Sequence, residues 1–327
     1  WKYTALLPTL KKLVKNAGPA ETSLGGSRSY IQHNPETLPQ WALDLINRKP
    51  PGKEKNGDHA LWHLSAAFAD DLYIVDIPAG VCVDEPFSLD VHGRGGLLHA
   101  PRVLIRLGKN AQAAFYEVYN SAEPCWFVPA VLIALEDGAE LLHSRLAQNA
   151  DGSVLTPVTN IRLSGNACLK SYNMISDGQI TRNQYHAALT GEEARCELFA
   201  MHLLKASQSG ETAVAVSHEA ENCFSMQTVK SVLKDSSKGA FQGAIHVDRH
   251  AQKTDAHQLS NALILDEGAE MNTKPELEIY ADDVKCSHGA TVGELDTEGL
   301  FYLRSRGIPE DEARRLLIKA FIGEILD

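Results

Sequence analysis

A thiol and an imidazole stand two residues apart near the C-terminal end of the chain, in the run Cys286-Ser287-His288. If this segment is an extended strand, positions 286 and 288 lie on one face, about 6 to 7 Å apart. A thiolate and a neutral imidazole suit iron, zinc or copper. Two ligands do not complete the four of a structural tetrahedral site, so sulfide, water or another subunit would supply the others. A buried cysteine beside a surface histidine is the alternative interpretation.

A second group of candidate ligands lies earlier in the chain. It comprises His246, His250 and His257 with Asp248 and Asp255. Alternation places positions 246, 248 and 250 on one face if the strand is regular. Solvent-facing polar residues explain the same pattern, so this group is the weaker candidate.

The adjacent acids Asp282 and Asp283 suggest a different class of protein, a β-helix carbohydrate-active enzyme. Neighbouring residues of a strand point to opposite faces, so the two carboxylates could act on one bond only across a bulge or turn. The chain contains no GxxxxGK[ST], GxSxG or HExxH motif. The sequence therefore favours a protein that performs no catalysis of its own.

A repeat of alternating strands must position these residues, and it extends from residue 73 to about residue 295. Its short apolar runs are broken by Gly, Asp and Asn, which is the period of strands rather than helices. Each unit holds a strand, a tight turn, a small residue and a second strand. The small residues recur at spacings of 28, 28 and 27 residues, at Ala111, Ala139, Ala167 and Ala194.

A near-constant period of two strands and two turns is typical of a solenoid whose coils share one core. The sequence therefore predicts a mainly β protein, with a parallel β-helix as the simplest fit. Ile105, Ile133 and Ile161 are expected at equivalent inward positions. An antiparallel sandwich with evenly spaced hairpins is the alternative.

Different patterns flank the repeat. Residues 1–70 are expected to form an irregular lead-in with one short helix after Asp58, and residues 71–298 the β-helix core. In residues 299–327, Pro309 and the acidic residues after it predict a helix that runs to the last residue. The apolar surface of this helix is too wide for packing against its own domain alone. Either a partner protein binds to the remaining apolar face, or C-terminal residues absent from this sequence cover it. That face includes Leu317, Ile318, Phe321 and Ile322.

The composition of the chain disfavours nucleic acids, membranes and zinc fingers. Lys and Arg number 31 against 42 Asp and Glu, a net charge of −11, which disfavours nucleic acid and anionic membranes. The longest uncharged apolar stretch, residues 124–135, is too short to span a bilayer. The six cysteines are far apart without a CxxC pair, which disfavours zinc fingers and suggests a reducing, cytoplasmic setting. The first residue, Trp1, suggests a fragment without its natural start.

Residues 280–293 (YADDVKCSHGATVG) resemble the SufB/SufD family of scaffold subunits in the Suf system for iron–sulfur cluster assembly. Residues 273–279 (TKPELEI) and 300–309 (LFYLRSRGIP) extend the resemblance, which is dense over residues 222–321 and thin elsewhere. SufB carries Glu after the matching histidine where this chain has Gly289. The resemblance is therefore stronger to the SufD branch.

The resemblance implies a right-handed parallel β-helix that pairs with SufB and docks the ATPase SufC through its C-terminal helices. A nascent iron–sulfur cluster would form at the SufB interface, with His288 by motif and Cys286 beside it as contributors. The cluster would be transient and is not expected in the isolated chain, which could form a homodimer. A homomeric structural solenoid is the remaining alternative. The family's N-terminal helical region is missing, and its C-terminal region stops early.

Overall fold

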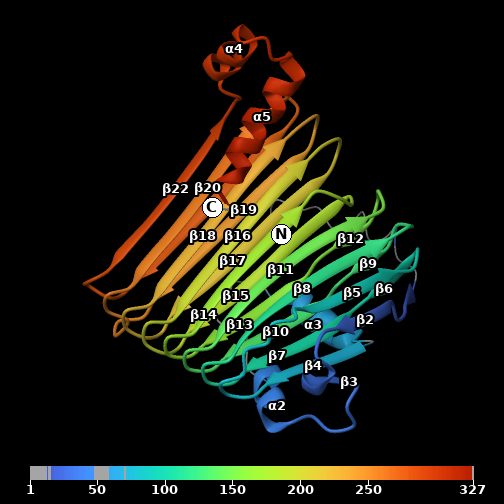
Figure 1. Ribbon diagram of the computed structural model, residues 1–327, viewed down its shortest axis with the longest axis vertical. Coiled ribbons are helices and arrows are strands. Elements are labelled where there is room, and N and C mark those ends of the chain that lie inside the picture. Colours follow the sequence, from blue (N-terminus) through green and yellow to red (C-terminus); the bar gives the residue numbers. More distant parts are fainter. Residues whose placement is uncertain (1–12, 14–15, 48–58, 70, 326–327) are drawn as a thin grey trace.

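The chain is wound into a parallel β-solenoid of eight turns, seen from one side in Figure 1. The computed structural model describes residues 13, 16–47, 59–69 and 71–325. Two sheets face each other across the core, and within them almost all neighbouring strands run parallel. The mainly β, parallel β-helix prediction is therefore confirmed, and the antiparallel sandwich is not formed.

The first sheet has nine strands. In spatial order they are β2 (Glu21–Gly25), β5 (Phe87–Gly93), β8 (Gln112–Ser121), β11 (Glu140–Asn149), β14 (Cys168–Ile175), β16 (Arg195–Leu204), β18 (Phe224–Leu233), β20 (Asp255–Ile264) and β22 (Lys285–Gly293). The second sheet has thirteen strands: β1 (Asn16–Ala17), β3 (Ile31–His33), β4 (Asp71–Ile77), β6 (Leu97–His99), β7 (Pro101–Leu107), β9 (Trp126–Phe127), β10 (Ala130–Leu135), β12 (Val154–Leu155), β13 (Val158–Leu163), β15 (Ile180–Leu189), β17 (Ser209–His218), β19 (Lys238–Val247) and β21 (Glu270–Ile279).

The sequence repeat corresponds to one turn of the solenoid. Ile105, Ile133 and Ile161 are directly paired on β7, β10 and β13 and are at most 2% exposed. All three belong to the main core between the sheets. The expected equivalence of these positions is confirmed, because alternating side chains on in-register strands stack on one face.

The recurring turn before each small residue requires an unusual backbone. Asn110, Gly138 and Asn166 have positive φ values of 55°, 67° and 56°, and each immediately precedes a fully buried alanine. Gly and Asn tolerate this left-handed conformation best, which explains their recurrence in the sequence. The backbone N–H of Gly138 donates to the Gly165 carbonyl of the next coil at 2.8 Å, so successive turns are stacked as well.

The N-terminal end of the solenoid is capped rather than open. β2 pairs with β5 and β3 pairs with β4, both antiparallel. The helices α2 (Gln40–Asn47) and α3 (Ala60–Ala67) pack on the outer face of the first coils through Ala42, Leu61 and Trp62. The short helix predicted after Asp58 is confirmed as α3, although Asp58 itself lies outside the described residues. A three-residue 3-10 helix (Arg28–Tyr30) precedes β3.

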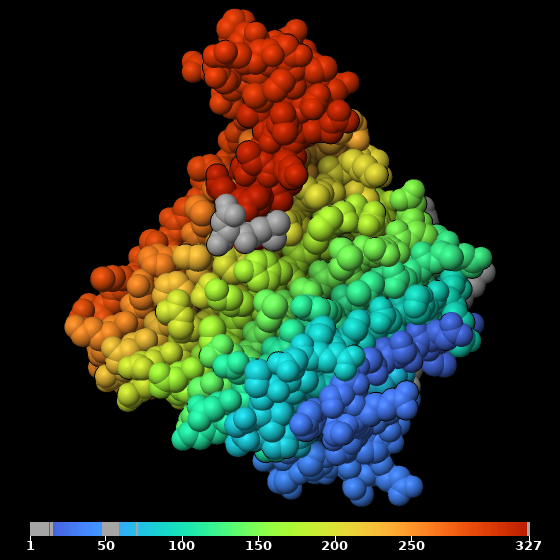
Figure 2. Space-filling model, in the orientation of Figure 1, coloured from blue at the N-terminus to red at the C-terminus, as the bar shows by residue number. Residues whose placement is uncertain are grey.

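The C-terminal end carries two helices, α4 (Thr297–Ser305) and α5 (Glu310–Gly323). α4 projects beyond the solenoid, and α5 runs back over the strands of the first sheet (Figures 1 and 2). Helix α5 begins directly after Pro309, as expected. The prediction that it runs to the last residue is wrong, because it ends at Gly323 and the chain turns so that Ile325 is buried. None of the helices in the described part of the chain is long and apolar enough to cross a membrane.

Candidate functional site

The last coil of the solenoid consists of β21 and β22. Each lies at the edge of its sheet, with no strand beyond it in the described part of the chain, and Figure 1 shows β22 at one end of the solenoid. β22 pairs residue by residue with β20, through to Leu263 and Gly293. Side chains alternate along such a strand, so Cys286 and His288 lie on the same face, as the sequence predicts. Their role as ligands stays a prediction.

Cys286 points into the solenoid. Its side chain is half-buried and packs against an apolar cluster that includes Ile245, Val247 and Ala256. Burial raises the pKa of the thiol, the Asp255 carboxylate raises it further, and the backbone N–H of Ala256 opposes both effects. The thiol is therefore protonated at neutral pH until a metal displaces the proton.

His288 is exposed at the open end of the solenoid. In the register of the sheet it lies beside Gln258 of β20, on the inward face. Its imidazole is therefore accessible to a molecule that approaches the last coil. Together the two side chains provide one soft sulfur ligand and one nitrogen ligand for a metal shared with another subunit.

A hydrogen-bonded chain on the outer face fixes β22 to β20. His257 Nδ1 lies 2.7 Å from Ser287 Oγ, and His257 Nε2 lies 2.7 Å from the Asp255 carboxylate. Ser287 stands between the two candidate ligands but points to the opposite face. The chain therefore holds the terminal strand in register and engages both nitrogens of His257.

The structure brings the second group of candidates together only in pairs, His257 with Asp255 and His246 with Asp248. β19 ends at Val247 and Asp248 begins a turn, so the regular strand on which a shared face of positions 246, 248 and 250 depends is not formed. His246 Nε2 lies 3.0 Å from the Asp248 carboxylate. His250 Nε2 donates to the Glu219 carbonyl at 2.8 Å. Across the described residues, no group of three or more His, Cys, Asp or Glu is arranged to hold a metal ion.

The adjacent acids Asp282 and Asp283 lie in a bend before β22 and not on a strand. The prediction assumes that both residues lie on a strand and point to opposite faces, and this local structure is not formed. Asp283 forms an ion pair with Lys253, and its backbone N–H donates to Gln252. These contacts explain Asp283 as part of a surface turn.

Apolar side chains are exposed around the last coil. Val292 is 55% exposed and Tyr280 is 50% exposed, with Ile279 and Leu259 also exposed. They lie next to two strand edges whose backbone groups are available for pairing. Exposed apolar surface beside a free strand edge is typical of a protein–protein contact.

Helix α5 is anchored to the solenoid through one lysine. Lys230 of β18 places its ammonium 4.7 Å from the centre of the Phe321 ring, donates to the Phe321 carbonyl at 2.6 Å and pairs with Glu324. The four residues expected to bind a partner are all only partly exposed: Leu317, Ile318, Phe321 and Ile322. At least Phe321 is thus committed to packing within the chain.

The most exposed apolar side chains of the C-terminal region lie elsewhere. Phe301 and Tyr302 of α4 are 74% and 57% exposed, and Leu316 of α5 is 43% exposed. These two aromatic residues are not among the predicted partner-binding residues. Their signal was present in the adjacent aromatic pair within a run with helical periodicity.

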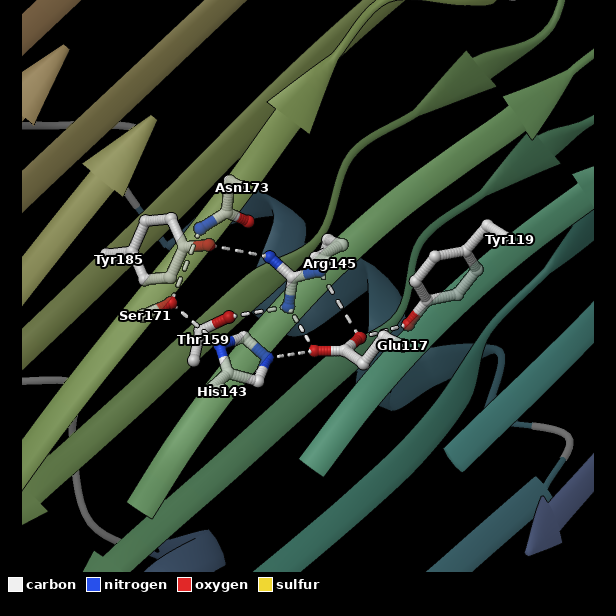
Figure 3. A network of polar contacts seen from close by, with 8 residues as sticks. All are labelled: Glu117, Tyr119, His143, Arg145, Thr159, Ser171, Asn173 and Tyr185. Atoms are coloured by element: carbon white, nitrogen blue, oxygen red, sulfur yellow. Dashed lines mark hydrogen bonds and ion pairs between the residues drawn. The ribbon is translucent and has the colours of Figure 1, made fainter. Parts of the chain in front are cut away.

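A buried polar network lies inside the early coils and was also missed (Figure 3). The Glu117 carboxylate accepts hydrogen bonds from Arg145 Nη2 at 2.8 Å, His143 Nε2 at 2.6 Å and the Tyr119 hydroxyl at 2.5 Å. Arg145 Nη1 also donates to the Tyr185 hydroxyl at 3.1 Å. All five side chains are at most 3% exposed.

The network fixes the charges of its members. Burial alone would raise the pKa of Glu117, but the Arg145 charge and the His143 hydrogen bond lower it to about 2. The same carboxylate raises the pKa of Arg145 against the effect of burial, whereas burial lowers the pKa of His143. The network is therefore an ion pair with a neutral imidazole, whose Nδ1 accepts from Ser171 at 2.7 Å.

Known proteins match both the β-helix and the C-terminal region. Residues 91–321 match the family model for the SufBD core domain of the SUF system for FeS cluster assembly. The chain is 30% identical over 289 residues to an iron–sulfur cluster assembly SufBD family protein of Synechocystis, which covers 84% of this chain. It is 36% identical over 189 residues to the iron–sulfur cluster assembly protein SufD of Escherichia coli, or 58% of this chain. It is 28% identical over 288 residues to the chloroplastic protein ABCI7 of Arabidopsis thaliana.

The matches cover 64%, 45% and 60% of these three relatives, so the chain spans about half to two thirds of their length. The family match covers both candidate ligands, the last coil and most of α5. The chain belongs to the SufBD family of iron–sulfur cluster assembly proteins.

Proposed function

We propose that this chain is a cytoplasmic scaffold subunit that pairs with SufB, docks the ATPase SufC and contributes His288 and Cys286 to a nascent iron–sulfur cluster. The cluster is the cargo of assembly and not a resident cofactor. The observation that carries the proposal is the location of one thiol and one imidazole on the same face of an open terminal coil. An incomplete ligand pair at such an end fits a site shared with a second subunit.

The surroundings of the pair support the same assignment. The free edges of β21 and β22 offer main-chain groups to a partner, and Tyr280 and Val292 offer apolar surface. The thiol is protonated in the isolated chain because its pKa is raised, so iron binding must displace a proton. Stable iron binding is therefore expected only when the partner supplies further ligands.

His288→Ala is expected to abolish cluster formation in the complex with SufB and SufC, while both partners still associate. The imidazole is exposed and contributes little packing, so its loss should not weaken a large interface. Anaerobic reconstitution followed by absorption spectroscopy and iron and sulfide analysis measures the yield. His250→Ala is the matched control, because His250 is a solvent-exposed histidine on a nearby turn.

Cys286→Ser separates the two candidate ligands. A loss of cluster equal to that of His288→Ala identifies the thiol as a direct ligand, and Cys82→Ser controls for loss of an exposed thiol. A normal yield assigns Cys286 to packing in the last coil. A wild-type yield with His288→Ala would overturn the site.

Replacing Ile318 and Ile322 together by Lys is expected to abolish SufC association and leave the β-helix folded. Stacked coils depend mainly on their neighbours, so damage to α5 should stay local. Phe301→Lys tests the more exposed side of the same region without disturbing the packing of α5. Co-purification measures association, circular dichroism checks the fold, and Leu142→Lys on the outer face of β11 is the control. Undiminished SufC binding by both variants would contradict this docking surface.

A further inference from the structure

Two buried glutamine side chains lie inside the solenoid in one row with His288. Gln227 of β18 is paired in register with Gln258 of β20, and Gln258 is paired with His288 of β22. Gln227 and Gln258 are 1% and 2% exposed. Adjacent strands are about 4.8 Å apart, so the three residues form one column on the inward face. The column ends at the open coil with the imidazole.

Both amides are buried without a hydrogen-bond partner. The side-chain oxygen and nitrogen of Gln227 and Gln258 contact no donor or acceptor among the described residues. Buried amides are normally paired, and an apolar side chain of the same size would avoid the cost. Space is kept for Gln258 by Gly243 on the facing strand, where a Cβ would lie 2.9 Å from the amide nitrogen. Two orphaned amides under a candidate ligand therefore require an explanation.

We infer that Gln258 is a positioning residue for His288, an inference that rests on the proposed function. A histidine that binds a metal through one ring nitrogen presents an N–H at the other, and an outer acceptor fixes its tautomer and orientation. Gln258 is paired with His288 in the sheet and its Oε1 has no donor in the described part of the chain, so this oxygen is the acceptor available to the ring. In the same arrangement Gln258 Nε2 would donate to Gln227 Oε1, which also has no partner among the residues that the structure describes, as in a glutamine ladder along stacked strands.

This hydrogen bond would decide which ring nitrogen of His288 is free to bind iron. With the N–H held toward the interior, the remaining nitrogen of His288 faces the open end, where iron and a partner subunit can reach it. The neighbouring His257 does not compete for Gln258, because Ser287 and Asp255 engage both of its ring nitrogens on the outer face. Gln258 would contact the ligand and not the iron.

Two measurements test the role of Gln258. The first is the Fe²⁺ affinity of the anaerobic complex with SufB and SufC before sulfide is added. The second is the tautomer of His288 in the isolated chain, read from the ring ¹⁵N signals of histidine-labelled protein and assigned by their loss in His288→Ala. Only the second measurement is independent of partner and cargo.

Gln258→Leu is expected to weaken Fe²⁺ binding at least about 10-fold and to convert a single His288 tautomer into a mixture. Gln258→Glu keeps an acceptor at the same place and is expected to restore both properties. Ser260→Ala is the control, since Ser260 lies on the same strand and face and its hydroxyl contacts Thr273 instead. Thermal melting confirms folding of each variant, and Gln258→Met replaces the leucine variant if that variant does not fold.

The outcomes separate this inference from the proposed function. If His288→Ala loses Fe²⁺ binding but Gln258→Leu and Gln258→Met keep wild-type affinity and tautomer, Gln258 serves only the packing of the solenoid and the inference is wrong. If His288→Ala itself binds Fe²⁺ like the wild type, the proposed site fails. Loss of affinity in Ser260→Ala as well would show a general effect of disturbing β20 and would also overturn the role of Gln258.

Discussion

Arg145→Met is expected to lower the free energy of unfolding by about 3–5 kcal/mol, because it leaves a buried carboxylate without its counter-charge. Glu117 is 1% exposed and Arg145 is 3% exposed, and the guanidinium is the only cation in contact with Glu117 in the network of Figure 3. Urea unfolding at pH 7.5, followed by far-UV circular dichroism, measures the change.

A double variant separates the destabilisation caused by breaking the Glu117–Arg145 ion pair from the net contribution of the intact pair to the free energy of unfolding. Glu117→Leu combined with Arg145→Met removes both charges and is expected to recover most of the lost stability. Arg195→Met is the matched control, because Arg195 and Glu197 form an ion pair of 3.5 Å at the surface, where its loss should cost at most about 1 kcal/mol. A cost below about 1 kcal/mol for Arg145→Met would contradict the expected cost of an unpaired buried carboxylate.

Lowering the pH from 7.5 to 5 is expected to destabilise the fold by about 4 kcal/mol through His202 and His218. Burial lowers the pKa of each imidazole to about 4, against a usual value of about 6.5 in the unfolded chain. Below pH 6.5 the two imidazoles become protonated in the unfolded chain, whereas they stay neutral in the folded chain until the pH approaches 4. Stability therefore falls as the pH drops toward 4, by about 2 kcal/mol per histidine at pH 5.

The hydrogen bonds of the two histidines make them good targets for substitution. His202 contacts Thr212 at 2.8 Å and Ser231 at 3.2 Å, and His218 contacts Ser225 at 2.9 Å. Glutamine at both positions keeps polar atoms but does not titrate. Urea unfolding at both pH values should show a much smaller difference for the double variant than for the wild type, and His250→Gln should behave as the wild type. An unchanged pH dependence in the double variant would refute the assignment.

The coils could be predicted from sequence because their determinants are local. The alternation of apolar and polar residues predicts that Ile133 points inward, and Gly138 marks the turn that follows its strand. Each signal comes from residues within a few positions of the feature that it predicts. The strands β1, β2 and β3 could not be predicted because they have only two to five residues. Their positions are fixed by pairing with strands far along the chain, as β2 pairs with β5.

The candidate site divides in the same way. Cys286 and His288 are two residues apart on one strand, so their shared face follows from the strand period alone. The stacking of Gln258 beneath His288 depends on the length of a whole coil and could not be counted from the sequence. Glu117 and Arg145 contradict the expectation that inward positions are apolar, although their spacing of one 28-residue repeat places them opposite each other on neighbouring coils.

The antiparallel cap at the N-terminal end determines how the solenoid can associate. β2 and β3 are short and run against the coils, so a second solenoid cannot continue the parallel stack there. At the other end of the described solenoid, the edges of β21 and β22 can pair with further parallel strands. A contact that uses the same end of both molecules is self-limiting, whereas a head-to-tail contact would propagate into fibres. The antiparallel strands β2 and β3 therefore oppose head-to-tail stacking of solenoids, and they favour contacts that use the end formed by β21 and β22.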